Sequence, residues 1–178
     1  MTKDFIDKFS NSLCDVLDRE KSILIARDTR ASGIEIEKWI KNIMIEKGFN
    51  LHLAQVLPTP GISNLLEEGD YSLGIMITAS HNPNIDNGIK LFGGNGYKLS
   101  SSIEQDIEKK ILKNEFHSSH APNGEIKFLD YSFGQYINSV VDKEINFKQR
   151  ILVDCSNGAF SELCNFYRNK NIEYINNS

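Results

Sequence analysis

The chain has few of the residues that mark disulfide-bonded, collagen-like or disordered proteins. Its 178 residues include three cysteines, four prolines and one tryptophan. Cys14, Cys155 and Cys164 are odd in number and lack the short spacings of a metal site, so we expect reduced thiols and a cytoplasmic protein. Apolar residues make up 40% of the chain and charged residues 25%, which is typical of a globular protein with a packed core.

Excess positive charge and long apolar segments are also missing. The net charge of −4 at pH 7 disfavours a nucleic-acid partner, because proteins hold such partners with basic surfaces. No apolar run approaches the ~18 residues that a membrane-spanning helix needs. Residues 1–8 are charged and amphipathic, unlike a signal peptide. We therefore expect neither a nucleic-acid partner nor a membrane partner.

Apolar residues recur with two different periods along the first two thirds of the chain. Helical spacing predicts helices over residues 3–19, 33–47, 61–68 and 101–112, and short apolar runs predict buried strands over 22–26, 51–56 and 72–77. Strands that alternate with helices through short loops indicate an α/β fold, a mostly parallel sheet with helices on both faces. Ligand groups in such sheets gather beyond the carboxyl ends of the strands, where we expect Arg27, Thr59 and Ser80.

The pattern changes after residue 114. A polar loop at 116–124 precedes a predicted short strand at 126–128 and a helix at 131–141, and a charged segment at 142–150 follows. A new strand, helix and strand are then predicted over residues 151–155, 159–168 and 172–175. We predict one domain over residues 1–145 and the beginning of a second, similar domain over residues 146–178.

One segment carries the most specific signal. Residues 74–90 read Gly-Ile-Met-Ile-Thr-Ala-Ser-His-Asn-Pro-Asn-Ile-Asp-Asn-Gly-Ile-Lys. This stretch resembles the phosphoserine loop of the α-D-phosphohexomutases, which move a phosphoryl group between C1 and C6 of a hexose. Further similarity covers nearly the whole chain, and its motifs are most similar to those of the bacterial phosphoglucosamine mutase branch. These motifs lie in residues 26–33, 57–60, 86–92, 96–99 and 153–159.

The resemblance assigns roles to residues of this loop and its surroundings. Ser80 is implied as the residue that carries and exchanges the phosphoryl group, with Lys90 as a candidate general acid or base. His81 and Asn82 are implied to shape the loop, with His81 also a proton-carrying neighbour of the phosphate. We assign Arg27, Asn82 and Thr78 to phosphate and substrate binding. Plainer alternatives are a turn-capping Ser80, a solvated Lys90 and a structural ion pair at Arg27.

The resemblance also implies a metal ion, and this sequence contains only part of its ligand set. Family members hold Mg²⁺ with three aspartates and the serine phosphate, and only the serine, Ser80, is present here. The family's first strand, sugar-recognition loop and carboxyl-terminal phosphate-binding domain are likewise not found between Met1 and Ser178. We therefore expect the chain alone to be inactive.

The implied activity of the intact enzyme is the interconversion of glucosamine 6-phosphate and glucosamine 1-phosphate through a hexose bisphosphate. Thr78 stands where this branch usually has serine, so a phosphomannomutase or phosphoglucomutase remains an alternative. Another alternative is a non-catalytic fragment, or a module that works with a separate chain carrying the missing domains. A nucleophile elbow is excluded because residues 79–81 lack its glycines. A P-loop is excluded because the glycine-rich turn at 93–96 has no Gly-Lys-Ser/Thr ending, and a calcium loop because Gly93 stands where its closing glutamate should be.

Overall fold

A computed structural model describes residues 1–117, 122–140 and 147–177. The elements run in the order α1 (Lys3–Val16), β1 (Ser22–Arg27), α2 (Ala31–Glu46), β2 (Leu51–Val56), α3 (Thr59–Glu68), β3 (Tyr71–Ile77), β4 (Ile89–Gly93), α4 (Ser101–Lys113), β5 (Ile126–Phe128), α5 (Ser132–Val140), β6 (Ile151–Asp154), α6 (Leu163–Phe166) and β7 (Ile172–Ile175). None of the helices in these described ranges is long and apolar enough to cross a membrane.

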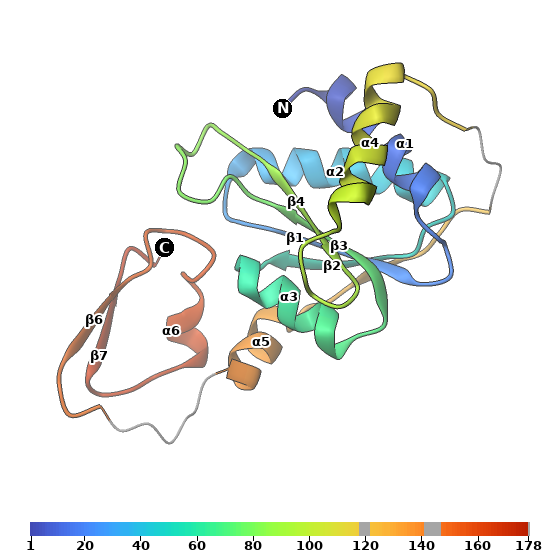
Figure 1. Cartoon of the computed structure of the whole chain (residues 1–178). Helices are drawn as coiled ribbons and strands as arrows, with labels where there is room; N and C mark the ends of the chain where they lie inside the picture. Colours follow the sequence, from blue (N-terminus) through green and yellow to red (C-terminus); the bar gives the residue numbers. More distant parts are fainter. Residues whose placement is uncertain (118–121, 141–146, 178) are drawn as a thin grey trace.

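The first unit is a sheet with helices on both faces (Figure 1). Its five strands lie in the order β4-β3-β1-β2-β5, and every neighbouring pair is parallel except β3 and β4. Helices α1, α2 and α4 pack on one face, and α3 and α5 pack on the other. The predicted α/β class is therefore confirmed.

The central strands are apolar throughout because both of their faces are covered. On β1, Ile23 and Ile25 join the core under α1 and α2, while Leu24 and Ala26 join the core under α3 and α5. Their side chains alternate between the faces with the period of two that a strand imposes. All four are fully buried, and burying a side chain as large as isoleucine stabilises the fold by about 1.5–3 kcal/mol. This packing fixes the strand ends that carry the site.

Two features differ from the sequence expectations. The edge strand β4 was not predicted as a strand, because Ile89–Gly93 is short, half-buried and contains a lysine. The helix expected over 159–168 is limited to α6, Leu163–Phe166. Residues before it form tight turns instead, in which the Ser161 N–H donates to the Gly158 carbonyl three residues earlier. Such three-residue bonds close turns and do not continue an α-helix.

The second unit is a parallel pair, β6 and β7, with α6 beside it (Figure 1). It contacts the first unit through aromatic rings: the Phe133 ring centroid on α5 lies 5.3 Å from that of Phe166 and 6.1 Å from that of Phe160. The Thr29 hydroxyl also donates to the Asn157 carbonyl over 2.8 Å. The domain boundary predicted at residues 145 and 146 lies outside the described residues.

Candidate functional site

The carboxyl ends of β1, β2 and β3 meet at one edge of the sheet, as parallel pairing requires. The backbone ties them together there: the Asp28 N–H donates to the Ile77 carbonyl over 3.0 Å, and the Leu57 N–H donates to the Arg27 carbonyl over 3.0 Å. Thr59, the first residue of α3, follows β2 at the same edge. The expected convergence of Arg27, Thr59 and Ser80 at this edge is thus what the topology produces.

Ser80 lies in the loop between β3 and β4 in a left-handed backbone conformation. Its φ is 58°, and the residue is exposed. This conformation costs a non-glycine residue about 1–2 kcal/mol, so it persists only where neighbouring contacts enforce it. The Ser80 N–H donates to the Thr78 Oγ1 over 3.0 Å, while the Ser80 hydroxyl has no hydrogen-bond partner within the described ranges. The backbone is held, and the hydroxyl is left for other chemistry.

Thr78 connects the serine to the neighbouring strand. Its side chain is almost completely buried, and its hydroxyl donates to the Asp28 Oδ2 over 2.6 Å while accepting from Ser80. A threonine hydroxyl has a single O–H donor. That donor is occupied by Asp28, so Thr78 supports the loop in this arrangement, and its expected phosphate contact stays a prediction.

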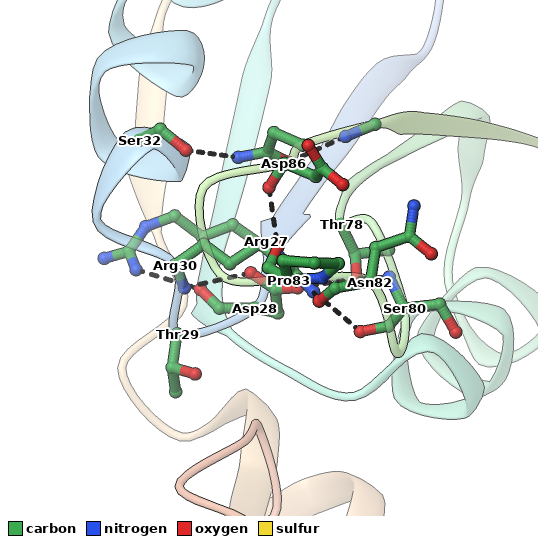
Figure 2. Close-up of polar contacts among 12 residues, drawn as sticks. Arg27, Asp28, Thr29, Arg30, Ser32, Thr78, Ser80, Asn82, Pro83 and Asp86 are labelled. Carbon is green, nitrogen blue, oxygen red and sulfur yellow. Dashed lines mark hydrogen bonds and ion pairs between the residues drawn. The ribbon is translucent and has the colours of Figure 1, made fainter.

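Among the described residues, Arg30 makes the most side-chain hydrogen bonds to the loop (Figure 2). Its Nε donates to the Asp28 Oδ2 over 2.9 Å, and its Nη2 donates to the carbonyls of Ser80 and Asn82 over 2.8 Å each. Its Nη1 donates to the Asp86 carbonyl over 3.0 Å and to the Pro83 carbonyl. The Arg30 side chain is only 8% exposed and that of Asp28 13%. Sequence reasoning missed this role, although Arg30 belongs to the family-like segment of residues 26–33.

Arg27 points to a different partner. Its Nε lies 3.5 Å from the Glu37 Oε2 of α2, and both side chains are largely buried. Burial raises the pKa of Glu37, because loss of water outweighs the attraction of Arg27 and Lys41. Arg27 makes no hydrogen bond to residues 78–88 in the described part of the chain. The structural ion pair is therefore what the structure shows, and phosphate binding by Arg27 stays a prediction.

The remaining predicted residues are exposed around the loop. Asn82 closes a turn through its N–H, which donates to the Ala79 carbonyl over 3.2 Å. Lys90 is the second residue of β4 and pairs with Met76 of β3. Among the described residues, neither His81 nor Lys90 has a side-chain hydrogen bond or ion pair. Their proposed roles in proton transfer stay predictions.

The far end of the loop has its own anchor. The Asn87 Nδ2 donates to the Ser32 Oγ at the start of α2 over 2.9 Å, and the Thr78 N–H donates to the Gly88 carbonyl over 2.9 Å. A Cβ at Gly88 would lie 2.7 Å from the Thr78 carbonyl oxygen, closer than carbon atoms approach a backbone oxygen. Position 88 therefore requires glycine if the loop is to return into β4.

The described residues supply too few ligands for a magnesium ion. Within residues 1–117, 122–140 and 147–177, no group of three His, Cys, Asp or Glu side chains is arranged to hold a metal. The Asp28 carboxylate beside the loop already accepts from Thr78 and Arg30. Magnesium needs several oxygen ligands at once. These residues do not form the expected Mg²⁺ site by themselves.

An exposed serine at the carboxyl edge of a mostly parallel sheet, beside a largely buried Arg–Asp pair, makes this unit an α/β domain with a candidate site at its strand ends. Residues 1–118 match the family model described as phosphoglucomutase/phosphomannomutase, alpha/beta/alpha domain I. The chain belongs to the phosphoglucomutase/phosphomannomutase family.

Relatives of known name agree with this assignment. The chain is 40% identical over 141 residues to the phosphoglucosamine mutase of Zymomonas mobilis, which covers 77% of this chain and 32% of that protein. It is 38% identical over 165 residues to the phosphoglucosamine mutase of Hamiltonella defensa, which covers 89% of this chain and 37% of that protein. The chain therefore spans about a third of the length of these relatives.

Solved structures share the fold. A phosphoglucomutase/phosphomannomutase family protein from Burkholderia thailandensis superposes with a TM-score of 0.76 at 20% identity, over 98% of this chain and 40% of that one. The Paramecium phosphoglucomutase parafusin superposes with a TM-score of 0.67 at 15% identity, over 98% of this chain and 39% of that one. The similarity includes the second unit, because nearly all of this chain is covered.

Proposed function

We propose that this chain provides the phosphoserine part of a mutase that interconverts glucosamine 6-phosphate and glucosamine 1-phosphate, with Ser80 as the phosphoryl carrier. The observation that supports this most is the geometry of Ser80, an exposed hydroxyl on a backbone fixed by Thr78 and Arg30. The relatives named phosphoglucosamine mutase support the choice of sugar. Thr78 favours a second candidate, a phosphomannomutase or phosphoglucomutase, because other branches of the family have threonine there.

The chemistry proceeds in two half-reactions. In the first, the bond between phosphorus and the Ser80 Oγ breaks as phosphorus bonds to a sugar hydroxyl oxygen, whose proton passes to a base. The Ser80 Oγ takes up a proton as it leaves. In the second, the phosphorus of the other phosphoryl group of the bisphosphate bonds to the Ser80 Oγ as its bond to the sugar oxygen breaks, and the Ser80 proton passes to that sugar oxygen. Phosphoryl transfer depends mainly on positioning and charge stabilisation, so a fixed Ser80 backbone contributes directly. We assign proton transfer to Lys90, with His81 beside the phosphate and Asn82 and Arg27 at the substrate.

Mg²⁺, which supplies charge stabilisation in such reactions, would take from this chain a single ligand, the phosphate on Ser80. The other ligands and the second phosphate site must come from outside these residues, in a further segment or a separate chain. We therefore propose that the chain alone does not complete the mutase cycle. Its substrate is a hexose phosphate, and its compartment is the cytoplasm, which suits its three free thiols.

Intact-mass analysis tests the assignment of Ser80. The purified chain is incubated with glucosamine 1,6-bisphosphate or glucose 1,6-bisphosphate and Mg²⁺, and the modified peptide is then sequenced. We expect one added phosphoryl group, on Ser80, and none on Ser80→Ala. Ser101→Ala, which changes an exposed serine at the start of α4, is the matched control and should label normally. A phosphoryl group that persists in Ser80→Ala, or one that maps to a residue other than Ser80, would contradict the proposal.

A further inference from the structure

The guanidinium of Arg30 has no donor left for a phosphate. An arginine side chain carries five N–H donors in a fixed planar fork. Arg30 uses one on the Asp28 carboxylate and the others on the carbonyls of Ser80, Asn82, Pro83 and Asp86 (Figure 2). A phosphate on Ser80 could bind this arginine only by displacing one of these bonds. Arg30 therefore cannot serve as a phosphate ligand while the loop keeps this conformation.

We propose that Arg30 is the positioning residue of the Ser80 loop. Four carbonyl oxygens of residues 80–86 converge on one side chain, and their partial negative charges would repel one another around an empty space. The planar fork bonds them all and thereby sets the path of the backbone, including the left-handed turn at Ser80. The consequence for phosphoryl transfer rests on the proposed function, whereas the control of loop geometry does not.

The ion pair adds an electrostatic effect. Asp28 lies beside the loop, and its carboxylate would repel a phosphate that carries about −1.5 to −2 charges at pH 7. Arg30 neutralises that carboxylate at 2.9 Å between Nε and Oδ2, in a largely buried pair where screening by water is weak. The Arg30 side chain therefore orders the loop and also offsets the negative charge of the Asp28 carboxylate beside the loop.

Arg30→Lys separates geometry from charge. Lysine keeps the positive charge but has three donors on a compact head, so it cannot satisfy five acceptors spread around a plane. In amide hydrogen exchange followed by NMR, we expect the N–H groups of Ser80, Asn82 and Asp86 to exchange at least about tenfold faster in this variant, since hydrogen bonds to charged groups are among the strongest. The amide of Ile75 in β3 should be unchanged. Arg150→Lys, an exposed arginine of the second unit, is the matched control and should leave all four amides as in the wild type.

A second variant tests whether the fork itself acts on the loop. Arg30→Ala leaves room for a free guanidinium ion, so millimolar guanidinium chloride, far below denaturing concentrations, should restore protection of the three loop amides. The same salt should not restore them in Arg30→Lys. Should either variant fail to fold, the wild-type protein still decides the matter, because the Arg30 guanidinium protons should exchange more slowly than those of Arg150.

The outcomes separate this inference from the proposed function. Faster loop exchange in Arg30→Lys supports positioning even where wild-type Ser80 takes up no phosphoryl group from the bisphosphate. Unchanged loop exchange in Arg30→Lys overturns positioning, even where Ser80 is phosphorylated. Loss of Ser80 phosphorylation in Arg30→Lys, with protection of the loop amides intact, also overturns positioning, because Arg30 would then act on the phosphate. Equal exchange of the guanidinium protons of Arg30 and Arg150 would overturn it as well.

Discussion

Replacing Thr78 by valine removes one hydroxyl and keeps the shape of the side chain. Thr78 is almost fully buried, and its hydroxyl makes two hydrogen bonds, to the Asp28 carboxylate at 2.6 Å and from the Ser80 N–H at 3.0 Å. A hydrogen bond to a charged group contributes about 1.5–3 kcal/mol and one between neutral groups about 0.5–1.5 kcal/mol. Asp28 and Ser80 both retain some access to water, so we expect a loss of about 2–3 kcal/mol, the lower part of the summed range.

Thr78→Ser is the matched control. Serine keeps both hydrogen bonds and loses one methyl group, which costs about 0.8 kcal/mol of apolar burial. Urea unfolding followed by the fluorescence of Trp39 measures both variants, because Trp39 is the only tryptophan and packs against the core of the first unit. The slope of free energy against urea should match that of the wild type, so the midpoint reports stability.

Two results would refute this reasoning. A Thr78→Val protein within about 0.5 kcal/mol of the wild type, the usual range for neutral surface changes, would show that the hydroxyl does not stabilise the loop. A Thr78→Ser protein as unstable as Thr78→Val would show that the methyl group matters instead. A double-mutant cycle with Asp28→Asn isolates the interaction between the two side chains, since residues in direct contact couple measurably.

Two further predictions concern buried carboxylates. Burial would raise the pKa of Asp15, but hydrogen bonds from the His117 N–H and imidazole and from Lys110 outweigh burial and lower the pKa. The stabilisation is therefore present above the pKa of the unfolded state and is lost as pH falls through the pKa of the folded state. Asp15→Asn should cost about 1–3 kcal/mol of unfolding free energy at pH 7 and less below pH 4, as measured by urea unfolding, and an equal loss at both pH values would contradict this. Arg27→Met removes the ion-pair partner of the buried Glu37 and should lower the free energy of unfolding by about 3–5 kcal/mol at pH 7. Because burial raises the pKa of Glu37, that loss should grow as pH rises through it, and adding Glu37→Leu should recover most of the stability; a double variant as unstable as Arg27→Met would speak against the pair.

The sequence by itself determined the order of the elements other than β4, and the place of Ser80, the proposed phosphoryl carrier. Strands at 51–56 and 126–128 have the bounds expected, because in both of them apolar residues flank polar ones. Ser80 follows from the abrupt end of the apolar run at Ile77, where a buried strand leaves the core. These are local properties, readable from neighbouring residues, and the family resemblance rests on the same local stretch.

Only the tertiary structure decided what the charged residues near this edge do. Arg27 and Arg30 are three residues apart and chemically identical. Arg27 pairs with Glu37 of α2, whereas Arg30 donates hydrogen bonds to backbone carbonyls of residues 80–86. The carbonyl acceptors of Arg30 lie about fifty residues further along the chain, and they come close to Arg30 only because β1 and β3 pair in parallel. The edge strand β4 likewise depends on pairing with β3, since its own residues are too few and too mixed in polarity to specify it. Contacts between distant segments depend on which strands pair in the sheet, and a local pattern of residues does not specify that pairing.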